Sequence, residues 1–401
     1  MNSPGAIPSE AAHSSIETSD AIPCSSASLN LPQEVQLFSF GSNSLGQLSI
    51  GHIEDAHTPT KVLLPPSTSL SNISIITGGN HTFLLSYKDE TLYSVGDNTF
   101  GQCATLPTSL DGQQSQRIKT AFTTVPSPTS TSHWISVSAG WQFSLLLSSE
   151  DKLYACGNGP RGELGLGAST VISTSPVPIP SFPPPSTTII QIASCVEHTL
   201  ARISDGSIYG WGNGRKGQLG TLPAGEKYIW SPLKLQIENP AGFEVAGIAT
   251  GREFSALISR EGEVYVMGND KWGVIKLNPL TKNPGWKSFG AGWGAVYVLT
   301  AEGSIISWGR GTHGQLPPDG MPELDKIAVG SEHGIGVGRD GKLYAWGWGE
   351  HGNCGPLVEE QGEVVRWKHE LAINGLNTSQ YRIEGIAAGC ATSWVWITRA
   401  V

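Results

Sequence analysis

A five-residue strand ending in glycine recurs seven times in this chain of 401 residues. Its first position is always aliphatic, its second is aromatic in six copies, and its fourth is usually bulky. This alternation predicts a strand packed on both faces. A second glycine follows each strand-ending glycine after four residues, as Gly101 follows Gly96, which indicates a tight turn. The copies are LFSFG at Leu37, LYSVG at Leu92, LYACG at Leu153, IYGWG at Ile208, VYVMG at Val264, IISWG at Ile305 and LYAWG at Leu343.

A second predicted strand precedes six of these copies, and signals such as Asp205-Gly206 and Asp340-Gly341 join the two strands as hairpins. A seventh upstream strand, AGCATSWVWI at Ala388, has no partner after it, and LFSFG at Leu37 has none before it. Pairing the two ends closes a ring without open sheet edges. The sequence therefore predicts an all-β fold, a seven-bladed β-propeller whose N- and C-terminal strands close one shared blade.

The domain organisation follows from the spacing and composition of these repeats. Residues 1–33 are rich in Ser, Ala and Pro and are expected to be a disordered tail. Residues 34–401 are expected to form a single propeller. The early repeats are more widely spaced than the late ones, which predicts surface-loop insertions near 104–133 and 168–190, where Ser- and Pro-rich segments lie.

Composition excludes several classes of function. The net charge of −9 disfavours direct binding to nucleic acid, and no apolar run approaches the ~18 residues of a membrane span. No secretory or transit signal is recognisable, so the cytoplasm, with the nucleus as a second location, is the expected setting. The six cysteines include no C-x-x-C pair, and no catalytic motif is present. We therefore expect a non-enzyme without cofactor or bound metal.

Chain direction predicts where an interaction site lies. Both glycine turns of each repeat share one face of the ring, the glycine face, while the hairpins share the other. Aromatic and arginine side chains, which dominate protein interfaces, gather in these turns. The predicted partner-binding residues of the glycine face are Trp141, Trp293, Arg310, His313, Glu332, Trp348, Glu350 and His351.

Structural interpretations compete with functional ones at several positions. His81, His198 and His333 share a repeat position with Phe143 and Phe254, so packing or a structural hydrogen bond is expected there. His313 and His351 share another position, where packing, partner contact and metal ligation all stay open. Cys354 stands where other repeats have leucine and is expected to be a small buried apolar residue.

The repeat resembles that of the regulator-of-chromosome-condensation family, whose members are seven-bladed propellers. Five segments are similar to a narrower group within it, the fungal killer-toxin-insensitivity or alpha-tubulin-suppressor proteins. Asn353 lies in one of these segments and joins the predicted partner-binding residues. The segments are FGSNSLGQLSIGHIEDAHTP, GRGTHGQL, GSEHGI, WGWGEHGNCGP and GCATSWVWI.

This resemblance implies a non-catalytic adaptor that forms a heterodimer with a small CSL-type zinc- or iron-binding diphthamide-synthesis protein. The heterodimer would support diphthamide biosynthesis and, indirectly, Elongator-dependent modification of wobble uridine in transfer RNA. The alternative is a guanine-nucleotide exchange factor for a small nuclear GTPase, although the tail lacks the Lys and Arg of a chromatin-binding segment. A third interpretation, ultraviolet sensing by clustered tryptophans, depends on Trp141 and Trp293 alone.

Overall fold

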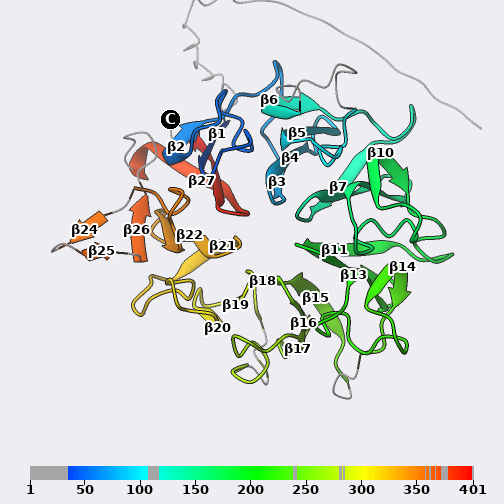
Figure 1. Ribbon diagram of the computed structural model, residues 1–401. Coiled ribbons are helices and arrows are strands. Elements are labelled where there is room, and N and C mark those ends of the chain that lie inside the picture. The colour runs from blue at the N-terminus through cyan, green and yellow to red at the C-terminus, as the bar shows by residue number, and fades with distance from the viewer. Residues whose placement is uncertain are drawn as a thin grey trace, which may run out of the picture. The chain divides into compact units, whose positions relative to one another are not determined.

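The computed structural model describes residues 35–106, 117–237, 242–279, 282, 285–356, 358–360, 363–365, 367–371 and 378–399. Over these residues the strands form seven blades around a common centre (Figure 1). The innermost strands contact one another in a closed cycle, β27, β3, β7, β11, β15, β18, β21 and back to β27. The predicted all-β, seven-bladed propeller is confirmed. The tail predicted over residues 1–33 lies outside the described residues.

Blades are numbered from the one that contains β1, and their strands are given from the centre outward. Blade 1 consists of β27 (Tyr381–Ala388), β28 (Thr392–Arg399), β1 (Val35–Gly41) and β2 (Ala56–Lys61). Blade 2 consists of β3 (Ile73–Thr77), β4 (His81–Ser86), β5 (Thr91–Asp97) and β6 (Ile118–Thr124). Blade 3 consists of β7 (Trp134–Ala139), β8 (Phe143–Ser148), β9 (Leu153–Asn158) and β10 (Ile172–Pro178). Blade 4 consists of β11 (Ile189–Cys195), β12 (His198–Ile203), β13 (Ile208–Asn213) and β14 (Tyr228–Lys234).

Over the described residues the next two blades have three strands each. Blade 5 consists of β15 (Val245–Thr250), β16 (Phe254–Ser259) and β17 (Val264–Gly268), and blade 6 of β18 (Ser288–Ala291), β19 (Ala295–Leu299) and β20 (Ile305–Gly309). Blade 7 consists of β21 (Leu324–Val329), β22 (His333–Gly338), β23 (Leu343–Gly347) and β26 (Trp367–Leu371). A small ribbon of β24 (Val358–Glu360) and β25 (Glu363–Val365) and the 3-10 turn η2 (Thr378–Gln380) complete the described elements.

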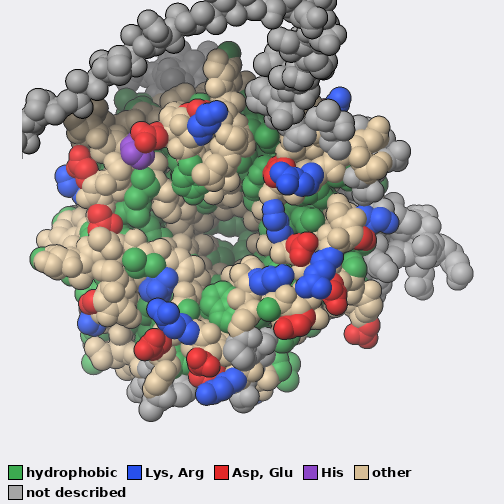
Figure 2. All heavy atoms as spheres, turned by 180° about the vertical axis from the view of Figure 1, so that it is seen from behind, with side chains coloured by type: hydrophobic (Ala, Val, Ile, Leu, Met, Phe, Trp, Pro, Cys, Tyr) green, Lys and Arg blue, Asp and Glu red, His purple; other side chains and the backbone are tan. Residues whose placement is uncertain are grey.

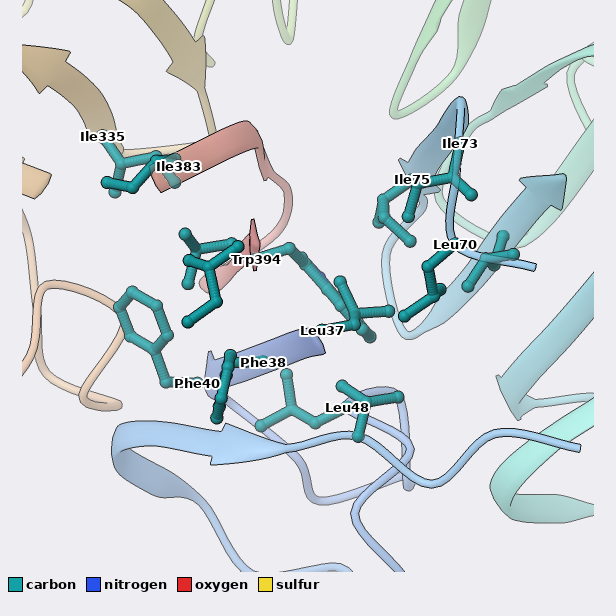
Figure 3. Close-up of a cluster of buried hydrophobic side chains, with 14 of the residues drawn as sticks. Leu37, Phe38, Phe40, Leu48, Leu70, Ile73, Ile75, Ile335, Ile383 and Trp394 are labelled. Atoms are coloured by element: carbon teal, nitrogen blue, oxygen red, sulfur yellow. The ribbon is translucent and has the colours of Figure 1, made fainter. Parts of the chain in front are cut away.

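The two chain ends close the ring in blade 1. Strand β1 pairs antiparallel with β28 from Val35 opposite Thr398 to Gly41 opposite Thr392. This pairing confirms the predicted shared blade. Around it, Leu37, Phe38 and Phe40 from the N-terminal strand and Trp394 from the C-terminal strand belong to one buried cluster (Figure 3). Burial of such side chains stabilises each by roughly 1.5–3 kcal/mol, so the ring is closed by packing as well as by backbone hydrogen bonds.

Each blade contains more strand than the two per repeat that the sequence predicts. The structure adds an innermost strand to every blade and an outermost strand to five of them. Two outermost strands, β6 and β10, lie within the segments 104–133 and 168–190, which the sequence predicts as loop insertions. Their alternation is weak because few of their side chains are buried, none in β10 and one in β6, so periodicity alone does not reveal them. Residues 107–116 of the first segment lie outside the described residues.

A repeated hydrogen bond joins neighbouring blades through buried histidines. His81, His198 and His333 each place Nε2 within 2.8–3.0 Å of a serine hydroxyl on the second strand of the next blade. Each serine in turn donates to a backbone carbonyl oxygen of the histidine's own blade. The partners are Ser144, Ser255 and Ser393. The predicted structural role of these histidines is confirmed.

A channel runs through the centre of the ring. Seen from behind, the molecule is open at its middle, and basic and acidic side chains lie interspersed around the opening (Figure 2). In the described part of the chain, no helix has the length and apolar character needed to cross a membrane.

Candidate functional site

The glycine turns are held together by one backbone hydrogen bond that recurs in all seven blades. The residue after each strand-ending glycine donates its N–H to the carbonyl oxygen of the residue before the second strand, as in Asp97 to Asn80 at 2.8 Å. Gly96 has a φ of 101°, and a Cβ there would lie 2.4 Å from that same oxygen. Glycine is therefore required where the two turns meet, and both turns of every blade lie on the glycine face.

Three tryptophans on this face surround a hollow of about 390 Å³, here called the aromatic hollow. Trp141 of blade 3 and Trp293 of blade 6 come from opposite sides of the channel, and their ring centroids are 5.8 Å apart. Trp348 of blade 7 stacks on the imidazole of His313 with a centroid distance of 4.7 Å and an interplanar angle of 14°. Trp141 and Trp348 remain 37% and 39% exposed, so each presents an apolar ring to solvent while its orientation is set by a neighbour.

Charged groups along the edge of the aromatic hollow are fixed by hydrogen bonds. The Glu332 carboxylate accepts from the Arg310 guanidinium and from Gln315 Nε2, the latter at 2.8 Å. The side chains of Arg310 and Glu332 are only 19% and 10% exposed, so this pair is largely desolvated and rigid. On the other side, His351 Nδ1 lies 2.9 Å from a carboxylate oxygen of Asp55, which connects blade 7 to the loop between β1 and β2 of blade 1.

A second hollow of about 480 Å³ adjoins the first and shares Trp293 and Glu332 with it. We call it the cationic hollow, because Arg252, Lys271 and Arg310 line it. The Arg252 guanidinium lies 5.1 Å from the Trp293 ring centroid. Lys271 Nζ and the Arg310 guanidinium lie 4.7 and 4.8 Å from the Trp272 centroid. Such cation–π contacts contribute about 0.5–1 kcal/mol each at exposed sites and position the cations around the hollow.

The structure brings the predicted partner-binding residues together. Trp141, Trp293, Arg310, Glu332, Trp348, Glu350, His351 and Asn353 line one or both hollows, and His313 lies behind Trp348. Asn353 is buried, and its Nδ2 donates to the Trp348 carbonyl oxygen at 2.9 Å. Its role is therefore to hold the turn that carries Trp348 rather than to present a contact surface.

Sequence reasoning missed three residues that shape the site. Trp272 and Lys271 line the cationic hollow. Trp272 occupies the repeat position of His313 and His351, so the repeat pattern could have identified it as a residue of the site. Asp55 lies in the segment FGSNSLGQLSIGHIEDAHTP, but nothing in the sequence indicates its pairing with His351, which is 296 positions away in the chain.

Two buried titratable groups at or next to the site are uncharged near neutral pH. Burial raises the pKa of the Cys354 thiol to about 12 and lowers the pKa of His333 to about 4, so near neutral pH these groups are an uncharged thiol and a neutral imidazole. Over the residues that the structure describes, no group of three or more His, Cys, Asp or Glu side chains is arranged to hold a metal ion.

Comparison with known proteins gives concordant results. Residues 36–395 match the family model of the RCC1-like domain. The chain is 30% identical over 375 residues to RCC1 repeat-containing protein C10F6.04 of Schizosaccharomyces pombe, covering 90% of this chain and 98% of that protein. It is 27% identical over 384 residues to the secretion-regulating guanine nucleotide exchange factor of Mus musculus, covering 84% and 79%. Among solved structures, Prp20p of Saccharomyces cerevisiae superimposes with a TM-score of 0.76 at 20% identity, covering 92% and 93%.

Proposed function

The chain belongs to the family of RCC1-like domains, and on that premise we propose that it is a non-catalytic interaction protein that docks one partner on its glycine face. The proposed partner is the small CSL-type zinc- or iron-binding protein of diphthamide synthesis. In the heterodimer, the propeller acts as an adaptor in diphthamide biosynthesis and, indirectly, in Elongator-dependent modification of wobble uridine. The expected setting is the cytoplasm, with the nucleus as a second location.

One observation carries this proposal. Four of the five segments that resemble the killer-toxin-insensitivity group lie between residues 309 and 397 and the fifth covers residues 40–59, and all five contribute to the aromatic hollow or its support. Four supply lining residues, represented by Ser42, Glu332, Trp348 and Ala391, and the fifth supplies His313, which stacks on Trp348. A resemblance that reflected propeller geometry alone would be spread evenly over seven blades. Its concentration around one exposed aromatic hollow supports a shared docking function.

Trp348→Ala tests the proposal. The full chain and the CSL-type protein are mixed, and the dissociation constant is measured by titration calorimetry. Loss of a central aromatic anchor is expected to cost ~2 kcal/mol, which corresponds to roughly 30-fold weaker binding. Tyr87→Ala is the matched control, since Tyr87 is 42% exposed and lies in the β4–β5 hairpin on the opposite face. Equal affinities of the Trp348 variant and the unmodified chain would remove the aromatic hollow from the interface.

Guanine-nucleotide exchange on a small nuclear GTPase is the second candidate, favoured by the similarity to the secretion-regulating exchange factor. Release of a fluorescent guanine nucleotide from a GTPase panel separates the two candidates. Accelerated release by the isolated chain supports exchange, whereas tight binding to the CSL-type protein without accelerated release supports the adaptor.

A further inference from the structure

We propose that the partner docks an acidic segment across the glycine face of blades 4 and 5, on a cationic arc formed by Arg215, Lys216, Arg252 and Lys271. The inference rests on the proposed function only in requiring a protein partner on this face. What it adds is a second contact region with its own chemistry, next to the aromatic hollow that Trp141, Trp293 and Trp348 surround.

The cations of the arc have no anionic partner in the described structure. Arg252 and Lys271 are exposed, and no carboxylate oxygen of the described residues lies within 4 Å of either charged group. The nearby carboxylates are engaged elsewhere. Glu253 accepts from Asn269 Nδ2 at 2.6 Å, and Glu332 accepts from Arg310 and Gln315. Three cations and two carboxylates line the cationic hollow, and Arg252 and Lys271 are the cations that an acidic side chain could pair with.

The arc is continuous between two blades. Arg215 and Lys216 are exposed in the turn after β13. Gly217 of the same turn lies against the end of β17, because a Cβ on Gly217 would be 3.7 Å from the Cα of Gly268. Lys271 follows β17 by three residues. Asp270, beside it, accepts the backbone N–H of Ile275 with one carboxylate oxygen at 2.7 Å and buries the other, and it forms no ion pair with a cation of the arc among the described residues.

The opposite face of the ring differs in this respect. Its basic side chains lie beside acidic ones, as in Arg260 with Glu244 and Arg382 with Glu384. In a chain with a net charge of −9, four exposed cations that form no ion pair among the described residues are grouped on the glycine face. Such a grouping steers association with a partner of opposite charge.

An acidic protein segment fits the arc better than RNA does. Nucleic-acid grooves without sequence preference depend on aromatic rings that are free to stack on bases. Here the Trp293 ring is covered by Arg252 and the Trp272 ring by Lys271 and Arg310.

The test compares Arg252→Glu/Lys271→Glu with the matched control Lys88→Glu/Arg260→Glu, which makes the same charge change in hairpins of the opposite face. The probe is a fluorescein-labelled peptide of about twelve residues that alternates Glu and Gly, titrated by anisotropy at about 50 mM and about 500 mM salt. The arc variant is expected to bind the peptide about ten-fold more weakly at low salt. The control should bind the peptide with an affinity within about two-fold of that of the unmodified chain. High salt should remove the difference in affinity between the arc variant and the unmodified chain.

Further measurements distinguish the outcomes that would overturn the inference. Equal peptide binding by the arc variant and the unmodified chain would overturn the inference. So would tighter binding of a labelled oligouridine of the same length, if that binding is lost in the arc variant. The peptide assay needs no CSL-type protein, so it decides the inference even if that partner fails to bind. Conversely, Trp348→Ala should leave peptide binding unchanged, because Trp348 does not line the cationic hollow.

Discussion

At the residue scale, Glu163 is the residue that departs most informatively from the repeat. In four other blades a buried glutamine occupies its position, and its side-chain oxygen accepts a backbone N–H of the turn, as Gln102 does from Phe100 at 2.8 Å. Glu163 makes the same bond with the N–H of Arg161 at 2.6 Å, but as an acid. Burial raises its pKa to about 7, with Glu197 contributing in the same direction.

Replacing Glu163 with glutamine should stabilise the propeller at alkaline pH. Because the folded-state pKa lies above the ordinary value of 4.5, the stability contributed by the protonated form is complete below pH 4.5. It is lost as the pH rises toward 7. Glu163→Gln is therefore expected to raise the free energy of unfolding by up to ~3 kcal/mol at pH 8 and to have little effect at pH 4.5. Urea unfolding of both proteins at pH 8 and pH 4.5 measures this difference in the free energy of unfolding. An equal increase at both pH values would show that ionisation of Glu163 is not its cause.

At the element scale, three of the seven blade interfaces are joined by a histidine–serine pair. Where the second strand of one blade begins with histidine, the corresponding strand of the next blade has serine as its second residue, as in His198 with Ser255. At the interface between blades 5 and 6 the strand begins with Phe254 instead, and the equivalent position in the next blade is Val296. The same interface is therefore built in a polar and an apolar version.

The polar version should make the propeller acid-labile. Burial lowers the pKa of His81 to about 3 and those of His198 and His333 to about 4. The stability contributed by each neutral imidazole is complete above pH 6.5 and is lost as the pH falls toward these values, by up to ~3 kcal/mol each. The double variant His198→Phe/Ser255→Val copies the pair of blades 5 and 6. Its melting temperature should fall less between pH 7 and pH 4.5 than that of the unmodified chain, as measured by calorimetry.

Parallel pH profiles for the double variant and the unmodified chain would show that this pair does not contribute to acid lability. Ser255→Ala is a useful control, because it removes the hydroxyl but keeps the buried imidazole. It should therefore retain the acid-dependent decrease.

At the scale of the whole molecule, stability depends on closure between the two ends of the chain. Strand β28 lies between β1 and β27, and seven consecutive residue pairs join it to β1. Without it, the edges of β1 and β27 would be open and part of the buried cluster around Trp394 would be exposed. Cooperativity of the ring therefore depends on a strand at the very end of the chain.

A chain that ends at Ala391 should lose cooperative unfolding. The truncation removes β28, opens two sheet edges and is expected to cause aggregation, which calorimetry and size-exclusion chromatography would detect. A chain lacking residues 2–33 is the matched control and also tests the predicted domain boundary; its melting temperature should equal that of the full chain. A truncated chain that melted cooperatively at the original temperature would show that closure is not required.

The repeat was sufficient to predict the number of blades, the shared terminal blade and the face on which the glycine turns lie. Periodicity, glycine spacing and chain direction are local properties, and in a propeller each unit repeats the same local geometry. It also predicted the structural role of His81, because an imidazole that alternates with phenylalanine at one position must fit a buried environment. The weakly alternating outer strands β6 and β10 escaped detection because few of their side chains are buried.

Only the tertiary structure decided which turns face one another across the channel. Trp141 and Trp293 meet from blades 3 and 6, His351 meets Asp55 through ring closure, and Arg252 is left without a carboxylate while Arg310 has one. None of these relations has a fixed sequence separation, since insertions differ between blades and the ring joins residues from opposite ends of the chain. The number and order of blades are local consequences of the sequence, whereas the chemistry of the glycine face arises from contacts that exist only after the ring has closed.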